Sequence, residues 1–212
     1  MLNKEQIKIV LEKLYEMYPD AECELRHTNA FELLISTVLS AQTTDKKVNQ
    51  VTEKLYGEFK TPQDFMTLEQ EDLELKIKEI GLYKSKSKHI LSLCKSLMEN
   101  FNSTVPCTME ELISLDGVGR KTANVVLSNA FNVPAFAVDT HVFRVANRIG
   151  LSNGKDVITV ENQLMKKVPK SLWILSHHTL IFHGRRLCKA RKPLCQECGI
   201  NHICKFYNKS KE

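Results

Sequence analysis

The stretch LDGVGRKTANVV, residues 115–126, places two glycines and two cations between two apolar runs. The preceding segment TMEELISL has the apolar spacing of a helix, and so does the sequence that follows Lys121. A nucleotide-binding P-loop requires Gly-x-x-x-x-Gly-Lys-Ser/Thr after a strand. Here Arg120 separates Gly119 from Lys121 and a helix comes first, so the stretch predicts two helices joined by a Gly-Val-Gly turn.

This turn can bind an anion, or it can simply end one helix and begin the next. Glycine tolerates positive φ and close backbone approach, and the N–H groups at a helix start bind phosphate with help from the helix dipole. Such contacts would hold a nucleic-acid backbone without reading its sequence. Lys121 falls in the first helical turn, where the dipole disfavours a protonated amine, and a neutral amine is a nucleophile. The alternative is a surface lysine that contacts phosphate.

Asp139 stands in AFAVDTHVFRVANRIG, residues 135–150, where an apolar run ends and a helical period begins. This position predicts that the aspartate is the N-cap of the helix. A carboxylate brought close to a lysine could instead take its proton or stabilise a cationic sugar. His141 and Arg144 follow on the same predicted helix.

The spacing of apolar residues is that of helices along nearly the whole chain. In residues 29–42, NAFELLISTVLSAQ, the apolar residues recur at the i, i+3, i+4, i+7 and i+8 positions of a buried helix face. We find no period-two run long enough for a sheet, so the sequence predicts an all-α protein. Further helices are expected at about residues 3–18, 44–59, 68–80, 84–101, 108–115, 120–131, 140–150, 156–168 and 171–185.

The domain division is expected at Asn132–Pro134, between two packed lobes, because no long low-complexity linker or internal repeat is present. Residues 22–133 are expected to form a six-helix domain that carries the glycine turn. Residues 1–21 together with 134–212 are expected to form a second helical domain. The 212 residues, 42% of them hydrophobic, suffice for one large or two small cores.

The net charge of +5 hides an asymmetry. Residues 1–118 contain 14 Lys and Arg against 20 Asp and Glu, whereas residues 119–212 contain 16 against 5. A basic half indicates a polyanionic partner, because unneutralised like charges repel one another; an ordinary basic surface is the alternative. No apolar stretch approaches the ~20 residues of a membrane span and no signal peptide is recognised, so we expect a soluble, intracellular protein.

Four of the seven cysteines are clustered, and clustered cysteines usually bind metal. The segment CKARKPLCQECGINHIC has the spacing Cys-x6-Cys-x2-Cys-x5-Cys and consists of residues 188–204. Four thiolates suit either a tetrahedral zinc ion or a [4Fe-4S] cluster, and coordination chemistry alone does not choose between them. The other three, Cys23, Cys94 and Cys107, are scattered and are expected to behave as small hydrophobic residues.

Five segments, in order along nearly the whole chain, resemble the endonuclease III type of base-excision DNA glycosylase in the helix-hairpin-helix superfamily. They are ELLISTVLSAQTTD, GLYKSKSKHI, LDGVGRKTANVV, VDTHVFRVANRIGL and the cysteine segment. The resemblance implies two helical lobes with a helix-hairpin-helix motif, a C-terminal iron-sulfur cluster loop and a DNA-binding cleft between the lobes. It also implies that the cysteines hold a [4Fe-4S] cluster.

The resemblance assigns roles to single residues. Lys121 matches the lysine that attacks C1′ of the damaged nucleotide, forms a Schiff base and cleaves the strand 3′ to the lesion by β-elimination. Asp139 matches the essential aspartate of the family. Gln42 and Leu82 match the two wedge residues of the family, which enter the DNA stack when the lesion is flipped out. Further DNA contacts are expected from the hairpin and from several other polar or cationic residues, namely Gly117, Val118, Gly119, Arg120, His141, Arg144, Arg186 and Lys192. The expected cluster ligands are Cys188, Cys195, Cys198 and Cys204.

One position departs from the family pattern: Asp116 stands where family members commonly have proline, which predicts weaker or more salt-sensitive DNA binding. Lys121 itself favours a bifunctional glycosylase and AP lyase over a monofunctional glycosylase. We therefore expect a base excision repair enzyme that removes oxidised pyrimidines from duplex DNA, and a different lesion preference is the nearest alternative. The alternative from another class is a non-catalytic binder of structured or damaged DNA. We also expect a monomer that is cytoplasmic, is associated with the nucleoid through DNA and has no membrane partner.

Overall fold

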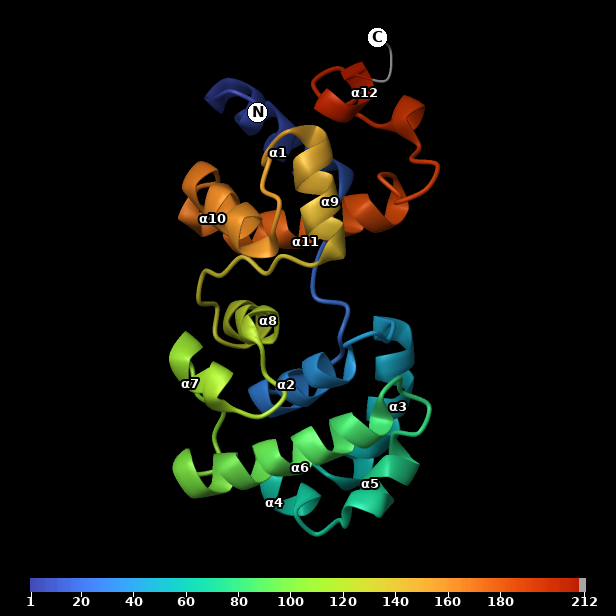
Figure 1. The fold of residues 1–212 in the computed structure, drawn as a ribbon, viewed down its shortest axis with the longest axis vertical. Coiled ribbons are helices and arrows are strands. Elements are labelled where there is room, and N and C mark those ends of the chain that lie inside the picture. The colour runs from blue at the N-terminus through green and yellow to red at the C-terminus, as the bar shows by residue number, and fades with distance from the viewer. Residues whose placement is uncertain (210–212) are drawn as a thin grey trace. The chain divides into compact units, whose positions relative to one another are not determined.

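The computed structural model describes residues 1–209, which form helices and loops and contain no strand (Figure 1). This confirms the prediction of an all-α protein. The chain divides into two compact units: one combines Met1–Glu22 with the segment from Pro134 onward, and the other is Cys23–Val133. Among the described residues, no helix is long and apolar enough to cross a membrane.

The unit formed by residues 23–133 is built around a helix that is buried on every side. This helix is α2, and all of residues 31–39 within it are buried. A helix that is hydrophobic all round belongs in the interior, and α2 contacts α3, α6 and α8. The helices of this unit are α2 (Ala30–Leu39), α3 (Asp45–Glu58), α4 (Pro62–Phe65), α5 (Gln70–Lys76), α6 (Tyr83–Asn100), α7 (Met109–Ser114) and α8 (Arg120–Ala130).

This unit contains seven helices, one more than expected, because the segment TPQD forms a helical turn. The Thr61 side chain accepts a hydrogen bond from the Asp64 N–H, and the Asp64 carboxylate accepts one from the Thr61 N–H. This capping box, with proline at the first helical position, starts a helix even in a short segment. Phe65 at its end is fully buried and packs edge-on against Phe31.

The other unit packs α11 against α9 and α1. The crossing of α9 and α11 is close because Gly184 has no side chain: a Cβ there would lie 3.0 Å from the Cβ of His141. The core of this unit includes Leu14, Phe136, Val145 and Leu180. The elements of this unit are α1 (Lys4–Met17), α9 (Thr140–Ile149), α10 (Val157–Lys167), η1 (Lys170–Leu172), α11 (Trp173–Arg186), η2 (Cys195–Glu197) and α12 (Lys205–Lys209).

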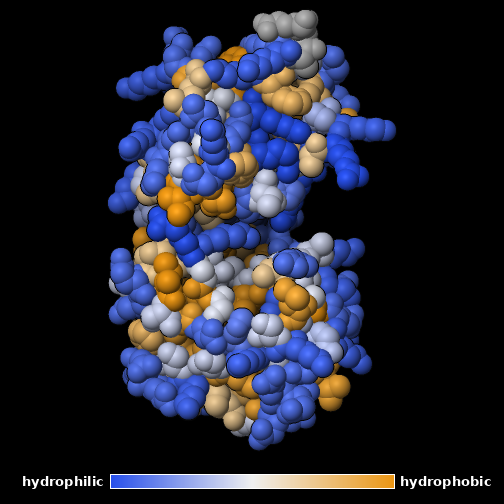
Figure 2. Space-filling model, in the orientation of Figure 1, coloured by the Kyte–Doolittle hydropathy of each residue, from blue (hydrophilic) through white to orange (hydrophobic). Residues whose placement is uncertain are grey.

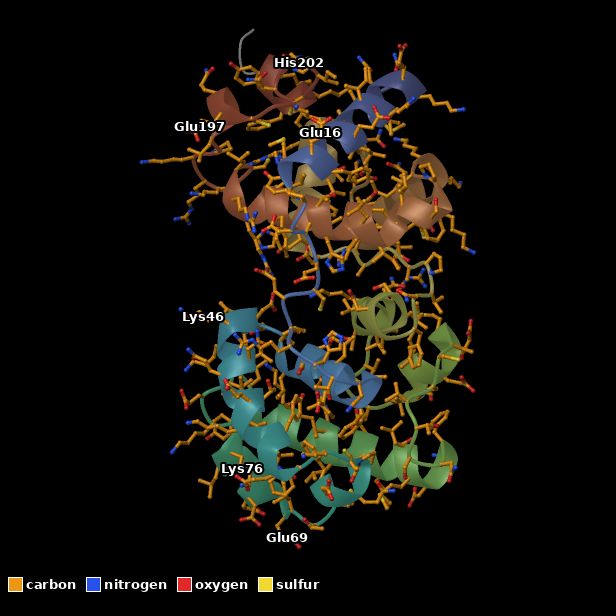
Figure 3. All side chains as sticks on the ribbon, turned by 180° about the vertical axis from the view of Figure 1, so that it is seen from behind. Glu16, Lys46, Glu69, Lys76, Glu197 and His202 are labelled. Carbon is orange, nitrogen blue, oxygen red and sulfur yellow. The ribbon has the colours of Figure 1, made fainter. Side chains whose placement is uncertain are left out.

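Polar side chains cover most of the face drawn in Figure 2. Lys76, labelled in Figure 3, is one of the surface cations that pair with a carboxylate. Its ammonium lies 2.7 Å from Glu58 and 4.9 Å from the centre of the Phe59 ring. Such exposed ion pairs contribute about 1 kcal/mol at most. The stability of the fold therefore rests mainly on its buried apolar side chains.

His178 on α11 gives the stability of the fold a pH dependence. Burial, and secondarily the neighbouring His177, lower the pKa of His178 to about 3, whereas an unfolded histidine titrates near ~6.5. Between these values the unfolded chain binds one proton more than the folded chain, so the free energy of unfolding falls as the pH decreases below ~6.5. We expect a loss of about 1 kcal/mol between pH ~7.5 and ~5.5 from this group, measured by urea unfolding.

Two histidine variants provide the comparison. His178→Gln should lose this part of the pH dependence, whereas His202→Gln, which alters an exposed histidine, should keep it. An equal loss of stability at acidic pH in His178→Gln and in the unaltered protein would show that the dependence arises from other groups.

Candidate functional site

The predicted glycine turn lies between α7, which ends at Ser114, and α8, which begins at Arg120. Leu115 and Val118 are buried, and the Val118 N–H donates to the Leu115 carbonyl at 3.2 Å. These two apolar side chains attach the turn to the interior. Because its side chain is buried, Val118 has only its backbone to offer to a ligand.

The two glycines of the turn serve different purposes. Gly117 has φ +75, which L residues rarely adopt, and a Cβ there would lie 2.9 Å from the Cβ of His89. Gly119 has an extended backbone with φ −91, and a Cβ there would meet no atom within 4 Å. The fold therefore requires glycine at position 117, whereas position 119 is open space that a ligand can approach closely.

The start of α8 is arranged to bind an anion. Gly119 is its N-cap and provides no side-chain hydrogen bond, and Gly119, Arg120 and Lys121 are all exposed. The first N–H groups of a helix have no partner within the helix, so an anion at this end would accept their hydrogen bonds and gain from the dipole. The Cα–Cβ bonds of a helix tilt toward its start, so a lysine side chain at position 121 can reach the same anion.

Asp116, the residue expected to repel phosphate, lies beside a histidine of α6. Its Oδ1 is 3.8 Å from the Nε2 atom of His89, and both side chains are partly exposed. When His89 is protonated, its positive charge offsets the negative charge of Asp116. A histidine that would reduce the repulsion of DNA when protonated therefore lies beside Asp116.

Asp139 is the N-cap of α9, as its sequence position predicts: its Oδ1 accepts a hydrogen bond from the Val142 N–H at 2.8 Å. The preceding residues 135–138 are buried, and Asp139 itself is partly exposed. Asp139 belongs to the unit that contains the C-terminal segment, whereas Lys121 belongs to the unit formed by residues 23–133. Its carboxylate is therefore held in a defined orientation by its own helix, independently of Lys121.

Gln42 and Leu82, the expected wedge residues, share an uncommon backbone conformation. Both have positive φ, 56 for Gln42 and 60 for Leu82, although neither is glycine. Leu82 is 57% exposed at the N-cap position of α6, and Gln42 is exposed between α2 and α3. A left-handed backbone conformation at a residue other than glycine costs free energy, and such residues concentrate at functional sites. Leu82 in addition exposes a large apolar side chain to solvent.

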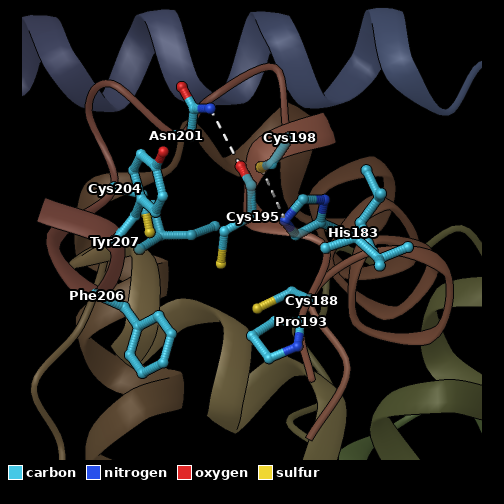
Figure 4. Close-up of a pocket in the computed structure, with 12 residues that line it drawn as sticks. His183, Cys188, Pro193, Cys195, Cys198, Asn201, Cys204, Phe206 and Tyr207 are labelled. Atoms are coloured by element: carbon cyan, nitrogen blue, oxygen red, sulfur yellow. Dashed lines mark hydrogen bonds between the residues drawn. The ribbon is translucent and has the colours of Figure 1, made fainter. Parts of the chain in front are cut away.

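The four clustered cysteines line one pocket (Figure 4). The pocket comprises about 330 Å³ of space, part of it open to solvent. Its other walls are largely apolar, formed by Ile149, Leu187, Pro193, Leu194, Phe206 and Tyr207 with His183 and Asn201. Glu197 and His202 of the same loop, labelled in Figure 3, are exposed and do not line the pocket. The pocket therefore offers a metal four sulfur donors, with the imidazole of His183 beside them.

Four cysteine thiolates are the donor set of an iron-sulfur cluster and also of a structural zinc ion. Cys188, Cys195, Cys198 and Cys204 all line this pocket, so the residues present fit a [4Fe-4S] cluster. Burial raises the pKa of Cys198 to about 11 and raises the pKa of Cys204, so a cationic group is needed to hold these thiols as thiolates.

Two arginines of α9 hold the cysteine loop. Arg144 donates from Nε to the Cys188 carbonyl at 3.1 Å and from Nη2 to the Gly184 carbonyl at 2.9 Å. Arg148 donates to the carbonyls of Lys189 and Ala190 at 2.7 and 3.0 Å. Arg148 was not among the residues predicted from the sequence, although its i+4 spacing from Arg144 places both on one helix face and could have indicated a shared role.

The remaining predicted DNA contacts occupy different settings. Arg186 pairs with Asp20 through two hydrogen bonds, at 3.1 and 2.6 Å, and lies over the Phe182 ring. Lys192 is exposed in the cysteine loop with φ 51. His141 is partly exposed, with Nδ1 3.3 Å from Nη2 of Arg144. Their contacts with DNA stay predictions.

His183 connects the pocket to the core. Its Nε2 lies 3.8 Å from the Cys198 sulfur, and its Nδ1 lies 2.9 Å from the Tyr18 hydroxyl. Burial lowers the pKa of His183 to about 4, so the ring is neutral near pH 7. A thiolate at Cys198 accepts a hydrogen bond, which places the ring proton on Nε2 and leaves Nδ1 to accept from Tyr18.

Two family models match the chain. Residues 35–170 match the HhH-GPD superfamily of base excision DNA repair proteins, and residues 188–204 match the iron-sulfur binding domain of endonuclease III. The second match coincides with the four cysteines of the pocket.

Whole-chain relatives agree with these matches. The chain is 51% identical to endonuclease III of Bacillus subtilis over 206 residues, which are 97% of this chain and 94% of that protein. It is 46% identical to endonuclease III of Escherichia coli K12 over 208 residues, 98% of this chain and 99% of that protein. A solved structure of a trapped covalent endonuclease III–DNA intermediate superposes with a TM-score of 0.96, at 49% identity and full coverage of both chains.

Proposed function

Because the chain belongs to the endonuclease III family, within the HhH-GPD superfamily of base excision DNA repair proteins, we propose that Lys121 and Asp139 carry its chemistry. The protein is a bifunctional DNA glycosylase and AP lyase with a [4Fe-4S] cluster. We assign Lys121 as the nucleophile and oxidised pyrimidines as the bases removed. We assign the four cysteines of the pocket, Cys188, Cys195, Cys198 and Cys204, as the cluster ligands.

The observation that carries this assignment is the position of Lys121. Lys121 stands in the exposed first turn of α8, two residues after the open position at Gly119. A DNA phosphate bound by the N–H groups of this helix start would place the adjoining sugar near a side chain that can act as a nucleophile. Binding of the backbone and attack on the sugar are thus assigned to one short segment.

The proposed reaction needs no oxidant or reductant. The unprotonated Nζ of Lys121 attacks C1′, the glycosidic C1′–N bond breaks, and the base leaves with the bonding electrons and takes up a proton. Opening of the sugar ring leaves an imine between Nζ and C1′. Loss of a proton from C2′ then expels the 3′ phosphate and nicks the strand, and hydrolysis of the imine frees Lys121.

Asp139 is assigned as the carboxylate that supports this attack. Its Oδ1 is fixed by the Val142 N–H at 2.8 Å, so the charge does not have to be ordered during the reaction. The carboxylate can take the proton of the Lys121 ammonium before attack, or it can stabilise positive charge that develops at the sugar. Either role requires its negative charge, which a cap alone does not.

The cluster is assigned to shaping the loop of residues 188–204. When bound, it supplies iron positions that hold four thiolates together. Arg144 and Arg148 donate to carbonyls at the beginning of this loop, and Lys189, Arg191 and Lys192 are spaced along it without an acidic neighbour among residues 189–195. Cations on a loop of defined shape can bind phosphate at fixed positions.

The two glycines of the turn provide a test of the DNA-binding assignment. Gly119→Ser should leave the free energy of unfolding unchanged within ~0.5 kcal/mol or increase it, because serine is a favourable N-cap and the added side chain meets no atom. The same variant should bind DNA about tenfold more weakly, because the side chain obstructs hydrogen bonds to a charged phosphate. Urea unfolding and equilibrium titration of a duplex measure the two quantities.

Gly117→Ser is the matched variant and should behave in the opposite way. Its positive φ and the contact with His89 predict a loss of about 2 kcal/mol of folding stability. If Gly119→Ser binds DNA as tightly as the unaltered protein, phosphate does not occupy the space at position 119.

The proposed function is tested with a duplex that carries one thymine glycol and, separately, one abasic site. The protein should release the damaged base, cleave the strand 3′ to the site and form a covalent complex with DNA when borohydride is added, since borohydride reduces an imine. A protein that binds both duplexes but neither cleaves nor traps them would be a non-catalytic binder of DNA shape.

We further propose that the protein acts as a monomer in the cytoplasm. All seven cysteines lack disulfide bonds, which agrees with a reducing compartment. Light scattering of the purified holoprotein at micromolar concentration tests the oligomeric state, and a mass of about twice 24.3 kDa would contradict the proposal.

A further inference from the structure

Lys86 on α6 is a buried lysine that the reaction does not use. The residue is only 4% exposed, although a lysine is rarely buried unless its ammonium is paired. Burial lowers the pKa of Lys86 to about 8. A fold that tolerates this cost must gain from the contacts of the ammonium.

The Lys86 ammonium binds the end of α2 and the loop that follows it. It donates to the carbonyls of Leu39 and Ala41 at 2.8 and 2.5 Å, and it lies 3.3 Å from Oγ1 of Thr43. An ammonium has three N–H donors, and here each has an acceptor. The carbonyls at the end of a helix have no partner within it and attract a cation.

These contacts lie on both sides of Gln42 along the chain. The residue lies between Ala41 and Thr43, both of which Lys86 binds, and it has φ 56. A left-handed backbone at a residue other than glycine costs about 1–2 kcal/mol and persists only where its surroundings hold it. Lys86 supplies that restraint on both sides of Gln42.

The same residue is joined to Leu82. The backbone N–H of Lys86 donates to the Leu82 carbonyl at 3.0 Å and so closes the first turn of α6. The Gly81 N–H lies 3.3 Å from Oγ1 of Thr43, the atom that also faces the Lys86 ammonium. The loop after α2 and the loop before α6, which lie in the unit formed by residues 23–133 (Figure 1), therefore meet at Lys86.

We propose that Lys86 is a positioning residue that holds Gln42 and Leu82 in one fixed arrangement, so that both side chains enter the DNA stack together when a nucleotide is displaced. The proposal rests on the proposed function, because it concerns the step that exposes the damaged nucleotide to Lys121. Filling the space left by a displaced base requires side chains that are already ordered, since ordering them during binding would cost affinity. Lys86 would not contact DNA itself.

The experiment measures displacement of a base without any chemistry. A duplex carries a tetrahydrofuran analogue of an abasic site opposite 2-aminopurine, whose fluorescence rises when it is unstacked. At saturating concentrations of holoprotein, the unaltered chain should raise this fluorescence. Lys86→Met, which keeps the length of the side chain but removes all three donors, should reduce the rise at least about threefold. Lys86→Arg, which keeps donors, should retain more than half of it.

Lys95→Met is the matched control. Lys95 lies on the same helix, is exposed and is 3.8 Å from Glu99, so this variant removes the same charge without touching either loop and should behave as the unaltered protein. If Lys86 only stabilised the fold, Lys86→Met would lower the melting temperature but leave the fluorescence rise at saturation unchanged, which would overturn the proposal.

Thr43→Val keeps the experiment decisive if Lys86→Met does not fold. The valine has nearly the shape of threonine and removes only the hydroxyl shared by Lys86 and Gly81. It should reduce the fluorescence rise in the same direction, and an unchanged rise would count against the proposal. A protein that displaces the base but does not cleave thymine glycol DNA would leave this proposal standing and contradict the proposed function. An unaltered protein that cleaves thymine glycol DNA without raising the fluorescence would contradict this proposal and leave the proposed function standing.

Discussion

Replacing Lys121 with glutamine is expected to abolish covalent trapping by borohydride and to slow strand cleavage by at least about 10³-fold. Glutamine has nearly the same length as lysine but its amide is not a nucleophile, so no imine can form. Lys121 is exposed on α8 and takes no part in the buried core, so folding and DNA binding should change little. Single-turnover cleavage of a thymine glycol duplex measures the rate, and gel analysis after reduction measures the complex.

Lys60→Gln is the control for the loss of one exposed lysine in the same unit, and it should trap as efficiently as the unaltered protein. A trapped complex in Lys121→Gln of the same yield as in Lys60→Gln would locate the reacting amine elsewhere. The N-terminal amine or another lysine would then have to be identified by peptide mapping of the trapped complex.

Replacing Asp139 with asparagine should slow base release by about 10²-fold while leaving the fold intact. Asparagine is as good an N-cap as aspartate, so its side chain can keep the hydrogen bond to the Val142 N–H. We expect a change in the free energy of unfolding within ~0.5 kcal/mol. The variant therefore removes the charge alone, and single-turnover base release with urea unfolding separates its two effects.

Asp156 offers the matched control, because it is the N-cap of α10 and accepts a hydrogen bond from the Thr159 N–H at 2.8 Å. Asp156→Asn makes the same chemical change at a cap with no assigned role in the reaction and should leave the rate unchanged. If Asp139→Asn also keeps the full rate, Asp139 is only a cap, and the carboxylate that assists Lys121 must be sought elsewhere.

Features that depend on neighbouring residues could be predicted from the sequence. The ends of α8 and α9 lie within one residue of their predicted ends, and Asp139 is the N-cap that its position after an apolar run indicates. The short helix Pro62–Phe65 is not among the predicted helices, and the reciprocal hydrogen bonds of Thr61 and Asp64 are what start it. The cysteine spacing indicated a metal site without choosing between zinc and iron-sulfur, and the family relationship made that choice.

The lysines of GLYKSKSKHI show what the sequence could not distinguish. Lys84, Lys86 and Lys88 alternate in one polar segment, yet only Lys86 of these three is buried. Its position four residues before the buried Ile90 was a weak signal, because the same spacing also occurs at the edge of an exposed helix face. Its partners lie 43 to 47 residues earlier in the chain, beyond the reach of any local pattern.

The sequence by itself therefore determined the helical class and the positions of most helices. These properties follow from caps, periodicity and spacing, which act over a few residues. Through its resemblance to a family, the sequence also predicted the cysteine ligands and the reacting lysine. Only the tertiary structure decided that Gly117 is required by the fold and Gly119 is not, that Arg144 and Arg148 bind the cysteine loop, and that Lys86 joins two loops. Those outcomes depend on which distant segments pack together, because a hydrogen bond forms only where packing brings donor and acceptor within about 3 Å.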